Sequence, residues 1–477
     1  MCTKLVLCFF PLNIHPNFYC FSVLVSYYSF LCTNAKLISS LPGQPQNVTF
    51  KQYSDYIVTD DHHGRALLYY FVEAESKDAL SLPLTLWFSG GPRCSSIGLG
   101  LFMENGPFRP GKDGNLIKNE FSWNLVSNML YVDSPIGVGF SYSNTSSDYN
   151  NYWNDTMTAL ENAKFLLKWF EKFPKYRNLD LYLAGDIYAG HFVPQLAALV
   201  LEYSRNVKPI KLKGIALGNP LLDIVISVDS ADYLWYHGAI SAELRTMKKK
   251  LCNDTRFILE FAQNKTSEDC KKMMDKMDEE LGIGFDTGDM LLPTCVSGQH
   301  DVASETTGIG DPCLADRITA YLNKPEVQKA LHANTTGLPY PWDLCFGPIK
   351  YQMDNLGINI IATLSAFLKK EHIPILLYSG DQDSNIPVTQ TRKIANMLAR
   401  DVKLTTLQEN GPWYNGYQVG GWSEAFGILR EGKNVTYLTF ATVKGGAHMV
   451  PFTSPSQSLI LFKSFINGSP PPTTSLN

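Results

Sequence analysis

The sequence has no CxxC pair, no HExxH segment and no long block of basic residues. The missing cysteine pairs argue against zinc-ribbon and thioredoxin-like chemistry, and the histidine spacing predicts no metal site. The formal net charge is −4, so nucleic-acid binding has little support. No internal repeat is present, and no motif predicts a cofactor.

Charged residues are also missing near the N-terminus. After Lys4, no Lys, Arg, Asp or Glu occurs until Lys36. The apolar and aromatic stretch FYCFSVLVSYYSFLC is followed by the small residues of CTNA, an order typical of a secretory signal. We therefore predict a signal over residues 1–35. Interruptions such as Pro11 and Pro16 disfavour the alternative, a membrane anchor, so no stable membrane insertion is expected.

Six of the ten cysteines lie beyond this signal, and an even number in a secreted chain suggests three disulfides. Eight Asn-x-Ser/Thr sequons add weight, because so many suggest glycosylation rather than chance. The sequons begin at Asn47, Asn144, Asn154, Asn253, Asn264, Asn334, Asn434 and Asn467. Together these features predict a protein of the secretory pathway, extracellular or vacuolar.

The rest of the 477-residue chain predicts a large α/β core, with apolar residues at 45%. Six apolar runs are typical of buried parallel strands. The runs begin at Ala66, Leu84, Asn128, Leu181, Ile210 and Ile373. Apolar residues recur at helical spacing over 155–174, where Pro174 ends the pattern. Strand, helix and strand in succession predict a doubly wound, mostly parallel sheet.

The pattern changes between residues 223 and 345. This segment is more charged, has helical stretches and contains most of the retained cysteines. We predict a helical, disulfide-bearing insertion that caps the sheet, so that the core spans 36–222 and 346–468. Residues 469–477 are rich in Pro, Ser and Thr and are predicted to be a disordered tail.

One strand-to-helix turn carries the strongest chemical signal. The stretch GDIYAG at residues 185–190 has the outline of a G-x-S-x-G elbow, in which a sharp turn exposes a nucleophilic serine. Here the tip is Ile187. Asp381 and Asp383 follow a later strand in YSGDQDSNIP, and His448 lies in GGAHMVP near the C-terminus. Nucleophile, acid and base in this order predict an α/β-hydrolase fold.

These motifs resemble those of the serine carboxypeptidases, especially the plant type. The family's WLNGGPGCSS appears as WFSGGPRCSS, its ESPAGVGFSYSNTSSDY as DSPIGVGFSYSNTSSDY and its GESYAGHYVPQLA as GDIYAGHFVPQLA, while ENGPF is intact. The resemblance runs from LPGQPQ to INGSP and so covers nearly everything after the signal. It implies a serine-type hydrolase that removes C-terminal residues from peptides.

Residue by residue, the resemblance implies a catalytic site. Ile187 occupies the nucleophile position, His448 matches the general base and Asp383 matches the acid that orients it, in preference to Asp381. The backbone amides of Gly91 and Tyr188 match the oxyanion hole, which stabilises the tetrahedral intermediate.

The resemblance also implies a subsite for the C-terminal carboxylate of the substrate. Its residues would be Ser89, Gly90, Glu104 and Asp186, although the family has Asn and Glu where Ser89 and Asp186 stand. Some acyltransferase relatives carry Asp at the second of these positions. The disulfides implied are Cys94–Cys345, Cys252–Cys270 and Cys295–Cys313.

Two further departures bear on activity. Ile187 has no lone pair, so no acyl-enzyme can form, and loss of a triad nucleophile typically costs about 10⁶ in kcat. A β-branched residue on a strained elbow costs about 1–3 kcal/mol, which predicts that the elbow relaxes and the Tyr188 amide turns away. Arg93 replaces a family glycine, and it is strained if that position needs a positive φ. Otherwise it only places a charge on the cleft floor.

Three hypotheses follow. The first is an inactive or severely impaired serine carboxypeptidase-like protein that still binds a peptide or peptide-like ligand in its cleft. The second is an active carboxypeptidase in which Ile187 is an allelic or sequence artefact, since one base change interconverts Ser and Ile codons. The third, motivated by Asp186, is an acyltransferase descendant that uses glucose esters. No nucleic-acid partner is expected, and a homodimer is left open.

Overall fold

The computed structural model describes residues 5–8, 20–23, 35–263, 265–282, 284–293, 295, 310–352, 357–430 and 432–475. The chain divides into two units, Met1–Asn34 and Ala35–Asn477. In the first, β1 (Leu5–Cys8) pairs antiparallel with β2 (Cys20–Val23). The rest of the predicted signal and the sequon at Asn264 lie outside the described residues. No helix in the described ranges combines the length and apolar character that crossing a bilayer requires.

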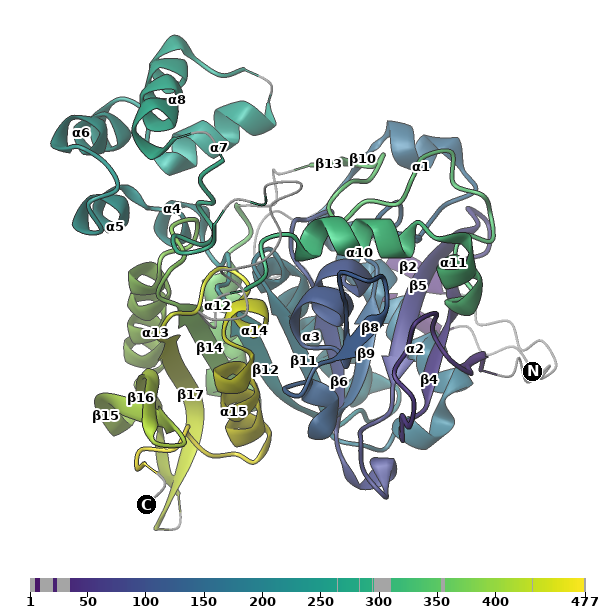
Figure 1. The fold of residues 1–477 in the computed structure, drawn as a ribbon. Coiled ribbons are helices and arrows are strands. Elements are labelled where there is room, and N and C mark those ends of the chain that lie inside the picture. Colours follow the sequence, from purple (N-terminus) through teal and green to yellow (C-terminus); the bar gives the residue numbers. More distant parts are fainter. Residues whose placement is uncertain are drawn as a thin grey trace. The chain divides into compact units, whose positions relative to one another are not determined.

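An eleven-stranded sheet runs through the second unit (Figure 1). Its strands are β3 (Leu37–Ile38), β4 (Gln52–Asp60), β5 (Arg65–Val72), β6 (Leu84–Phe88), β9 (Asn128–Val132), β11 (Leu181–Asp186), β12 (Leu212–Gly218), β14 (Ile375–Gly380), β15 (Thr405–Asn415), β16 (Gln418–Arg430) and β17 (Lys433–Val443). Their spatial order is β15-β16-β17-β14-β12-β11-β6-β9-β5-β4-β3. The six from β17 to β9 are parallel, and antiparallel strands flank them on both sides.

Helices cover both faces of this sheet (Figure 1). One face packs against α2 (Asp155–Lys172), α3 (Ala189–Asn206), α12 (Ile360–Ala366) and α13 (Val388–Val402). The other packs against the π-helix η2 (Ile97–Glu104), α10 (Leu314–Leu322), α14 (Val450–Thr453) and α15 (Pro455–Ile466). Strand β5 shows the division clearly: Tyr69 and Phe71 enter the first core cluster, and Leu68 and Tyr70 enter the second.

The strand directions correct one expectation. The run that begins at Ala66 forms β5, which pairs antiparallel with both β4 and β9 rather than parallel. A continuous apolar run reports burial on both faces and says nothing about direction. Strands β15 to β17, at the opposite side of the sheet, were not predicted. Their burial does not alternate: β15 is mostly exposed or half-buried, β17 ends in a continuous buried run, and register shifts interrupt the pairing of β16 with both, so no period of two residues marks them.

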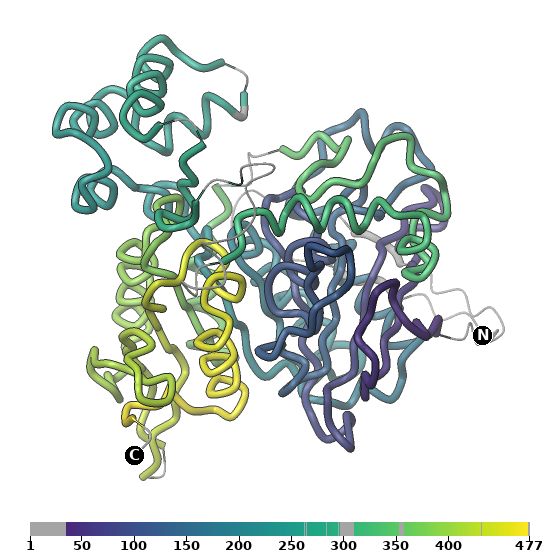
Figure 2. Tube along the Cα trace, in the orientation of Figure 1, coloured from purple at the N-terminus to yellow at the C-terminus, as the bar shows by residue number. Residues whose placement is uncertain are grey.

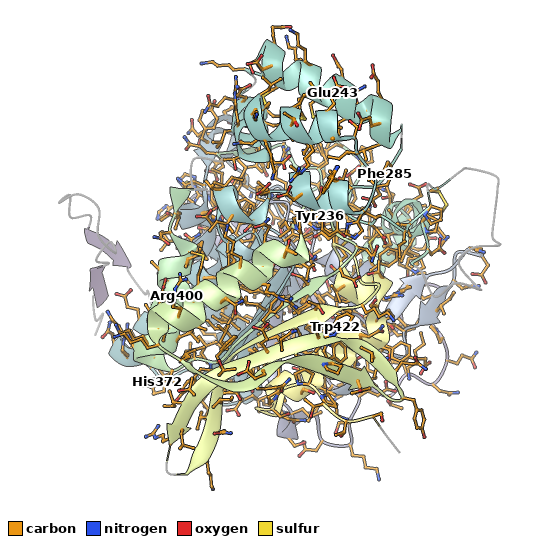
Figure 3. The ribbon with its side chains drawn as sticks, turned by 90° about the vertical axis from the view of Figure 1, so that its left-hand side faces the viewer. Tyr236, Glu243, Phe285, His372, Arg400 and Trp422 are labelled. Atoms are coloured by element: carbon orange, nitrogen blue, oxygen red, sulfur yellow. A yellow bond between two sulfur atoms is a disulfide. The ribbon has the colours of Figure 1, made fainter. Side chains whose placement is uncertain are left out.

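The segment after β12 forms a group of helices that projects from the sheet (Figure 2). It contains α4 (Ile224–Ser227), α5 (Ala231–Tyr236), α6 (Ala242–Lys250), α7 (Asp254–Ala262) and α8 (Glu268–Leu281). A small core of its own includes Leu234 and Leu244 and the disulfide Cys252–Cys270. Figure 3 shows Tyr236 and Glu243 on these helices.

The remainder of residues 223–345 packs differently. Helices α10 and α11 (Pro325–Ala330) place Ile318 and Val327 in the second core cluster beneath the sheet. The domain boundaries inferred from the sequence therefore stay a prediction.

In the C-terminal tail, the backbone carbonyl of Pro472 accepts a hydrogen bond from the Tyr414 amide at 2.8 Å.

Short strands and helices complete the described fold. Strand β7 (Phe108–Pro110) pairs with β8 (Leu116–Lys118), and β10 (Tyr152–Trp153) pairs with β13 (Lys350–Tyr351). Short helices are α1 (Ser146–Asn150), η1 (Ala79–Ser81), η3 (Trp123–Leu125), η4 (Pro174–Tyr176) and the π-helix η6 (Phe367–Glu371). Helix α2 begins where predicted because the Asn154 side chain accepts a hydrogen bond from the Met157 amide at 3.0 Å.

Candidate active site

The topology sets the position of the site. From β6 the chain passes to β9 on one side of that strand and later to β11 on the other. Such a switch in strand order opens a crevice at the carboxyl ends of parallel strands. Residues that follow β6, β11 and β14 therefore meet there, with His448 after β17.

The turn between β11 and α3 is intact although its tip is isoleucine. Ile187 is half-buried and has a φ of 56°, in the left-handed region. Its N–H donates to the Gly218 carbonyl at 3.0 Å, and its carbonyl accepts from the amides of Gly190 and Leu221 at 3.1 and 2.9 Å. The expected relaxation of the elbow is therefore wrong. The surrounding hydrogen bonds hold a conformation that costs a β-branched residue about 1–3 kcal/mol.

The elbow touches the loop that follows β6. A Cβ atom on Gly90 would lie 2.3 Å from the Tyr188 nitrogen and 2.7 Å from the Ile187 Cβ. Only glycine permits this approach. It keeps the Tyr188 amide against the Gly90–Gly91 loop, so the expected outward turn of that amide does not occur.

Two backbone amides face no protein acceptor. Among the residues that the structure describes, neither the Gly91 nor the Tyr188 N–H donates a hydrogen bond. Tyr188 stands at the N-terminus of α3, where the helix dipole favours negative charge. Two free donors on touching loops meet the requirement for stabilising an oxyanion.

A histidine and a buried carboxylate meet beside the elbow. Nδ1 of His448 lies 2.7 Å from Oδ2 of Asp383. The same oxygen accepts a hydrogen bond from the Asn219 side chain at 2.7 Å, while Oδ1 accepts from the amides of Asn385 and Ile386 at 2.8 and 3.2 Å. The carboxylate is thereby fixed from several directions. This is the arrangement of a general base and the acid that orients it.

The second aspartate of the loop faces elsewhere. Oδ1 of Asp381 accepts a hydrogen bond from the Gly445 amide at 2.7 Å.

Burial lowers the pKa of His448, but the neighbouring Asp383 carboxylate outweighs this effect, so the pKa lies above its ordinary value of 6.5. The imidazole can therefore accept a proton only above that raised value.

The four residues implied as a carboxylate subsite lie together. Glu104 on η2 and Asp186 at the end of β11 are both 1% exposed, and among the described residues neither carboxyl oxygen of Glu104 has a hydrogen-bond partner. Burial raises the pKa of Glu104 well above its usual range, and the Asp186 charge adds to this, so Glu104 holds the proton. The Gly90 amide donates to Asp186 at 3.3 Å, and Ser89 Oγ accepts from Trp87 at 3.1 Å.

This acid pair predicts a pH-dependent stability. A folded pKa above the unfolded value means that the pair stabilises the fold at low pH and ceases to do so as pH rises from about 4.5 through the folded pKa. We expect Glu104→Gln, which keeps a donor without the charge, to be more stable than wild type by about 2 kcal/mol at pH 7.5 and equal near pH 4. Urea unfolding at both pH values measures this. Glu120→Gln, at an exposed site, should change nothing; a gain at Glu104 that is independent of pH would contradict the assignment.

Arg93 does not strain the cleft floor. Its φ lies outside the left-handed region, so the position does not require glycine. The exposed side chain donates from Nη1 to the Gly347 carbonyl at 3.2 Å. It therefore places a charge beside the disulfide Cys94–Cys345.

The other two disulfides are Cys252–Cys270 and Cys295–Cys313, so all three pairs are those that the resemblance implied.

Sequence reasoning missed Asn219, which holds Asp383 and has a positive φ of 39°. The sequence feature that could have identified Asn219 is its position directly after the predicted strand that becomes β12, at the same sheet edge as the elbow. Tyr378 was also missed. Its hydroxyl is buried without a partner and lies near the Glu104–Asp186 pair.

Comparison with known proteins identifies the family. The family model described as serine carboxypeptidase matches residues 42–468. Serine carboxypeptidase-like 45 of Arabidopsis thaliana is 43% identical over 450 residues, covering 93% of this chain and 95% of the relative. Serine carboxypeptidase-like 46 of the same plant is 42% identical over 452 residues, covering 93% and 94%.

A solved structure shares the fold. Kex1, a prohormone-processing carboxypeptidase from Saccharomyces cerevisiae, superimposes with a TM-score of 0.68 at 20% identity, covering 87% of this chain and 91% of that one. Its likeness extends over the parallel sheet on which the elbow and the histidine stand, which confirms the predicted α/β-hydrolase fold. The motifs, the fold and the family match lead to one conclusion: this chain belongs to the serine carboxypeptidase family.

Proposed function

We propose that this protein binds peptides by their C-terminal carboxylate but is inactive or severely impaired as a peptidase. The observation that carries the proposal is Ile187 at the tip of an otherwise complete elbow. The family reaction needs a nucleophile that forms an acyl-enzyme, and an alkyl side chain supplies none. Position 187 therefore offers no group from which His448 could accept a proton.

Two hydroxyl groups next to the elbow and the β6 loop do not compensate for the missing serine. Ser89 is 1% exposed, and its Oγ accepts a hydrogen bond from Trp87 beneath the loop. The Tyr188 hydroxyl donates to Asp155 at 3.1 Å, behind the elbow. Neither side chain is therefore offered to His448 as a substitute nucleophile.

Binding depends on groups that remain in place. A protonated Glu104 beside Asp186 can donate a hydrogen bond to a carboxylate, because its carboxyl oxygens have no partner among the described residues. Because deprotonation would bring like charges together, binding should weaken as pH rises. A peptide with a free C-terminus fits this chemistry, and a C-terminal amide does not.

The test compares the wild type with His448→Ala on blocked dipeptides at mildly acidic pH, and exposes both to a serine-reactive phosphonate. We expect no turnover above that of His448→Ala and no mass shift. Turnover that the phosphonate abolishes would overturn the proposal in favour of an active enzyme. Calorimetry with a free and an amidated peptide tests binding, and equal affinities would count against the carboxylate subsite.

We also propose that the chain enters the secretory pathway, supported by its three disulfides and exposed sequons. Asn47, Asn144, Asn253, Asn434 and Asn467 are exposed. The Asn334 side chain is half-buried, and its Nδ2 donates to Gln328 at 2.9 Å, so the nitrogen that would carry a glycan already makes a contact within the fold.

We therefore expect glycans on the exposed asparagines and none on Asn334 when the protein is secreted from a eukaryotic host. Enzymatic deglycosylation in heavy-oxygen water followed by peptide mass spectrometry reports each site. Unmodified peptides at every exposed sequon would contradict the secretory assignment, whereas full occupancy at Asn334 would contradict only the argument from its hydrogen bond.

A further inference from the structure

A buried polar network lies directly behind the elbow. Its centre is Asp155, the first residue of α2, whose side chain has no exposed surface. Two groups from α3 contact Oδ2: Nδ1 of His191 at 2.9 Å and Nε2 of Gln195 at 3.3 Å. Two hydroxyl groups donate to Oδ1, that of Tyr188 at 3.1 Å and that of Tyr351 at 2.6 Å.

The network holds the residue whose amide faces the site. Tyr188 follows Ile187 directly, and its ring is 2% exposed. The ring stacks on His191 with centroids 5.1 Å apart and meets the edge of Tyr351 at 6.0 Å. Because the hydroxyl also bonds to Asp155, both the orientation and the position of the Tyr188 ring are fixed. The peptide plane before it has little freedom to rotate.

Tyr351 reaches this network from another part of the chain. It lies in β13, a few residues after a segment that braces the Gly91 loop. That bracing consists of the disulfide Cys94–Cys345 and a hydrogen bond at 2.7 Å from the Ser95 amide to the Leu344 carbonyl. Residues 344–351 therefore contact both loops that carry the free amides.

We propose that Asp155 and Tyr351 are positioning residues that hold the Tyr188 amide in register with that of Gly91. The Tyr188 side chain is tied down from the opposite face, which adds to the backbone hydrogen bonds that hold the left-handed φ of Ile187. Oxyanion stabilisation depends on donors held at about 3 Å from the developing charge, so a small rotation of this amide would remove most of its effect. The inference rests on the proposed function, in which serine at position 187 completes the site.

A purely structural role makes a different prediction. If the network only satisfies buried polar groups, removing a hydroxyl lowers stability and leaves the rate of the chemical step unchanged. If it positions the amide, kcat falls while KM stays the same, because the amide contacts the tetrahedral intermediate and not the ground state.

The experiment places Tyr351→Phe and Asp155→Asn separately in an Ile187→Ser background. Tyr182→Phe is the matched control, since its hydroxyl donates to the Ile466 carbonyl at 3.1 Å and lies near the start of β11, away from the elbow. We expect kcat to fall about tenfold for Tyr351→Phe and about a hundredfold for Asp155→Asn. KM should stay within about twofold, and the control should match its parent. An unchanged kcat in both variants would overturn the proposal.

A second measurement separates this inference from the proposed function. The proposed function fails if the wild type itself turns over substrate, whereas a silent Ile187→Ser only removes the kinetic readout, and crystal structures of Tyr351→Phe and Asp155→Asn in the wild-type chain then decide the inference. We expect residue 187 to leave the left-handed region and the Tyr188 amide to turn from Gly90. An elbow unchanged in both structures would overturn the proposal, and Tyr351→Phe remains informative if Asp155→Asn does not fold.

Discussion

Ile187→Ser should turn this protein into a reactive serine hydrolase. The parts that a serine needs are present: the His448–Asp383 pair at 2.7 Å, two free amides and a left-handed elbow. Restoring a triad nucleophile can raise kcat by about 10⁶, since its removal costs that much in a complete site. Serine also removes the crowding of a β-branched side chain at the tip. The measurements are turnover of blocked dipeptides and the mass shift left by a serine-reactive phosphonate.

The matched control is Ile187→Ala. It relieves the β-branched crowding but adds no hydroxyl, so it should stay unlabelled and inactive. Labelling of both variants would mean that another residue reacts. A folded but silent serine variant would instead assign the defect to the departures at Ser89 and Asp186. Glucose-ester donors should give no acyl transfer, and transfer without peptidase activity would favour the acyltransferase hypothesis.

Asp383→Asn in the same serine background should lower kcat by about 10⁴. Oδ2 of Asp383 accepts hydrogen bonds from both His448 and Asn219. An amide nitrogen there would offer a proton to Nδ1, which selects the wrong imidazole tautomer and leaves no acceptor for the serine proton. It would also abolish the negative charge that raises the pKa of His448. Steady-state kinetics and a histidine NMR titration report the two effects.

Asp381→Asn is the control, because this aspartate lies two residues away but accepts from Gly445 instead. We expect its kcat to stay within about threefold of the parent. The reverse ranking of the two variants would show that Asp381 orients the base. Equal and small effects would mean that His448 does not act as the base at all.

The amino-acid sequence by itself determined the family and the fold class, and it predicted the residues of the candidate site. Apolar runs placed β6, β9, β11, β12 and β14, because burial on both faces leaves few polar positions in a strand. Helical spacing of apolar residues and the stop at Pro174 predicted α2, and the structure added the cap by Asn154. The ordered motifs named Ile187, Asp383 and His448, since loops at one edge of a parallel sheet must meet whatever lies between them.

Only the tertiary structure decided how these parts behave. The antiparallel direction of β5 follows from its pairing with β4 and β9, which a local pattern does not encode. Local propensity predicted that Ile187 would relax its elbow, yet its N–H donates to the Gly218 carbonyl and its carbonyl accepts from the Leu221 amide, and these bonds hold the elbow. Asp155 and Tyr351 are 196 residues apart in sequence and meet only after folding. A contact of that kind depends on the placement of whole elements, so its consequences for the site could be seen only in three dimensions.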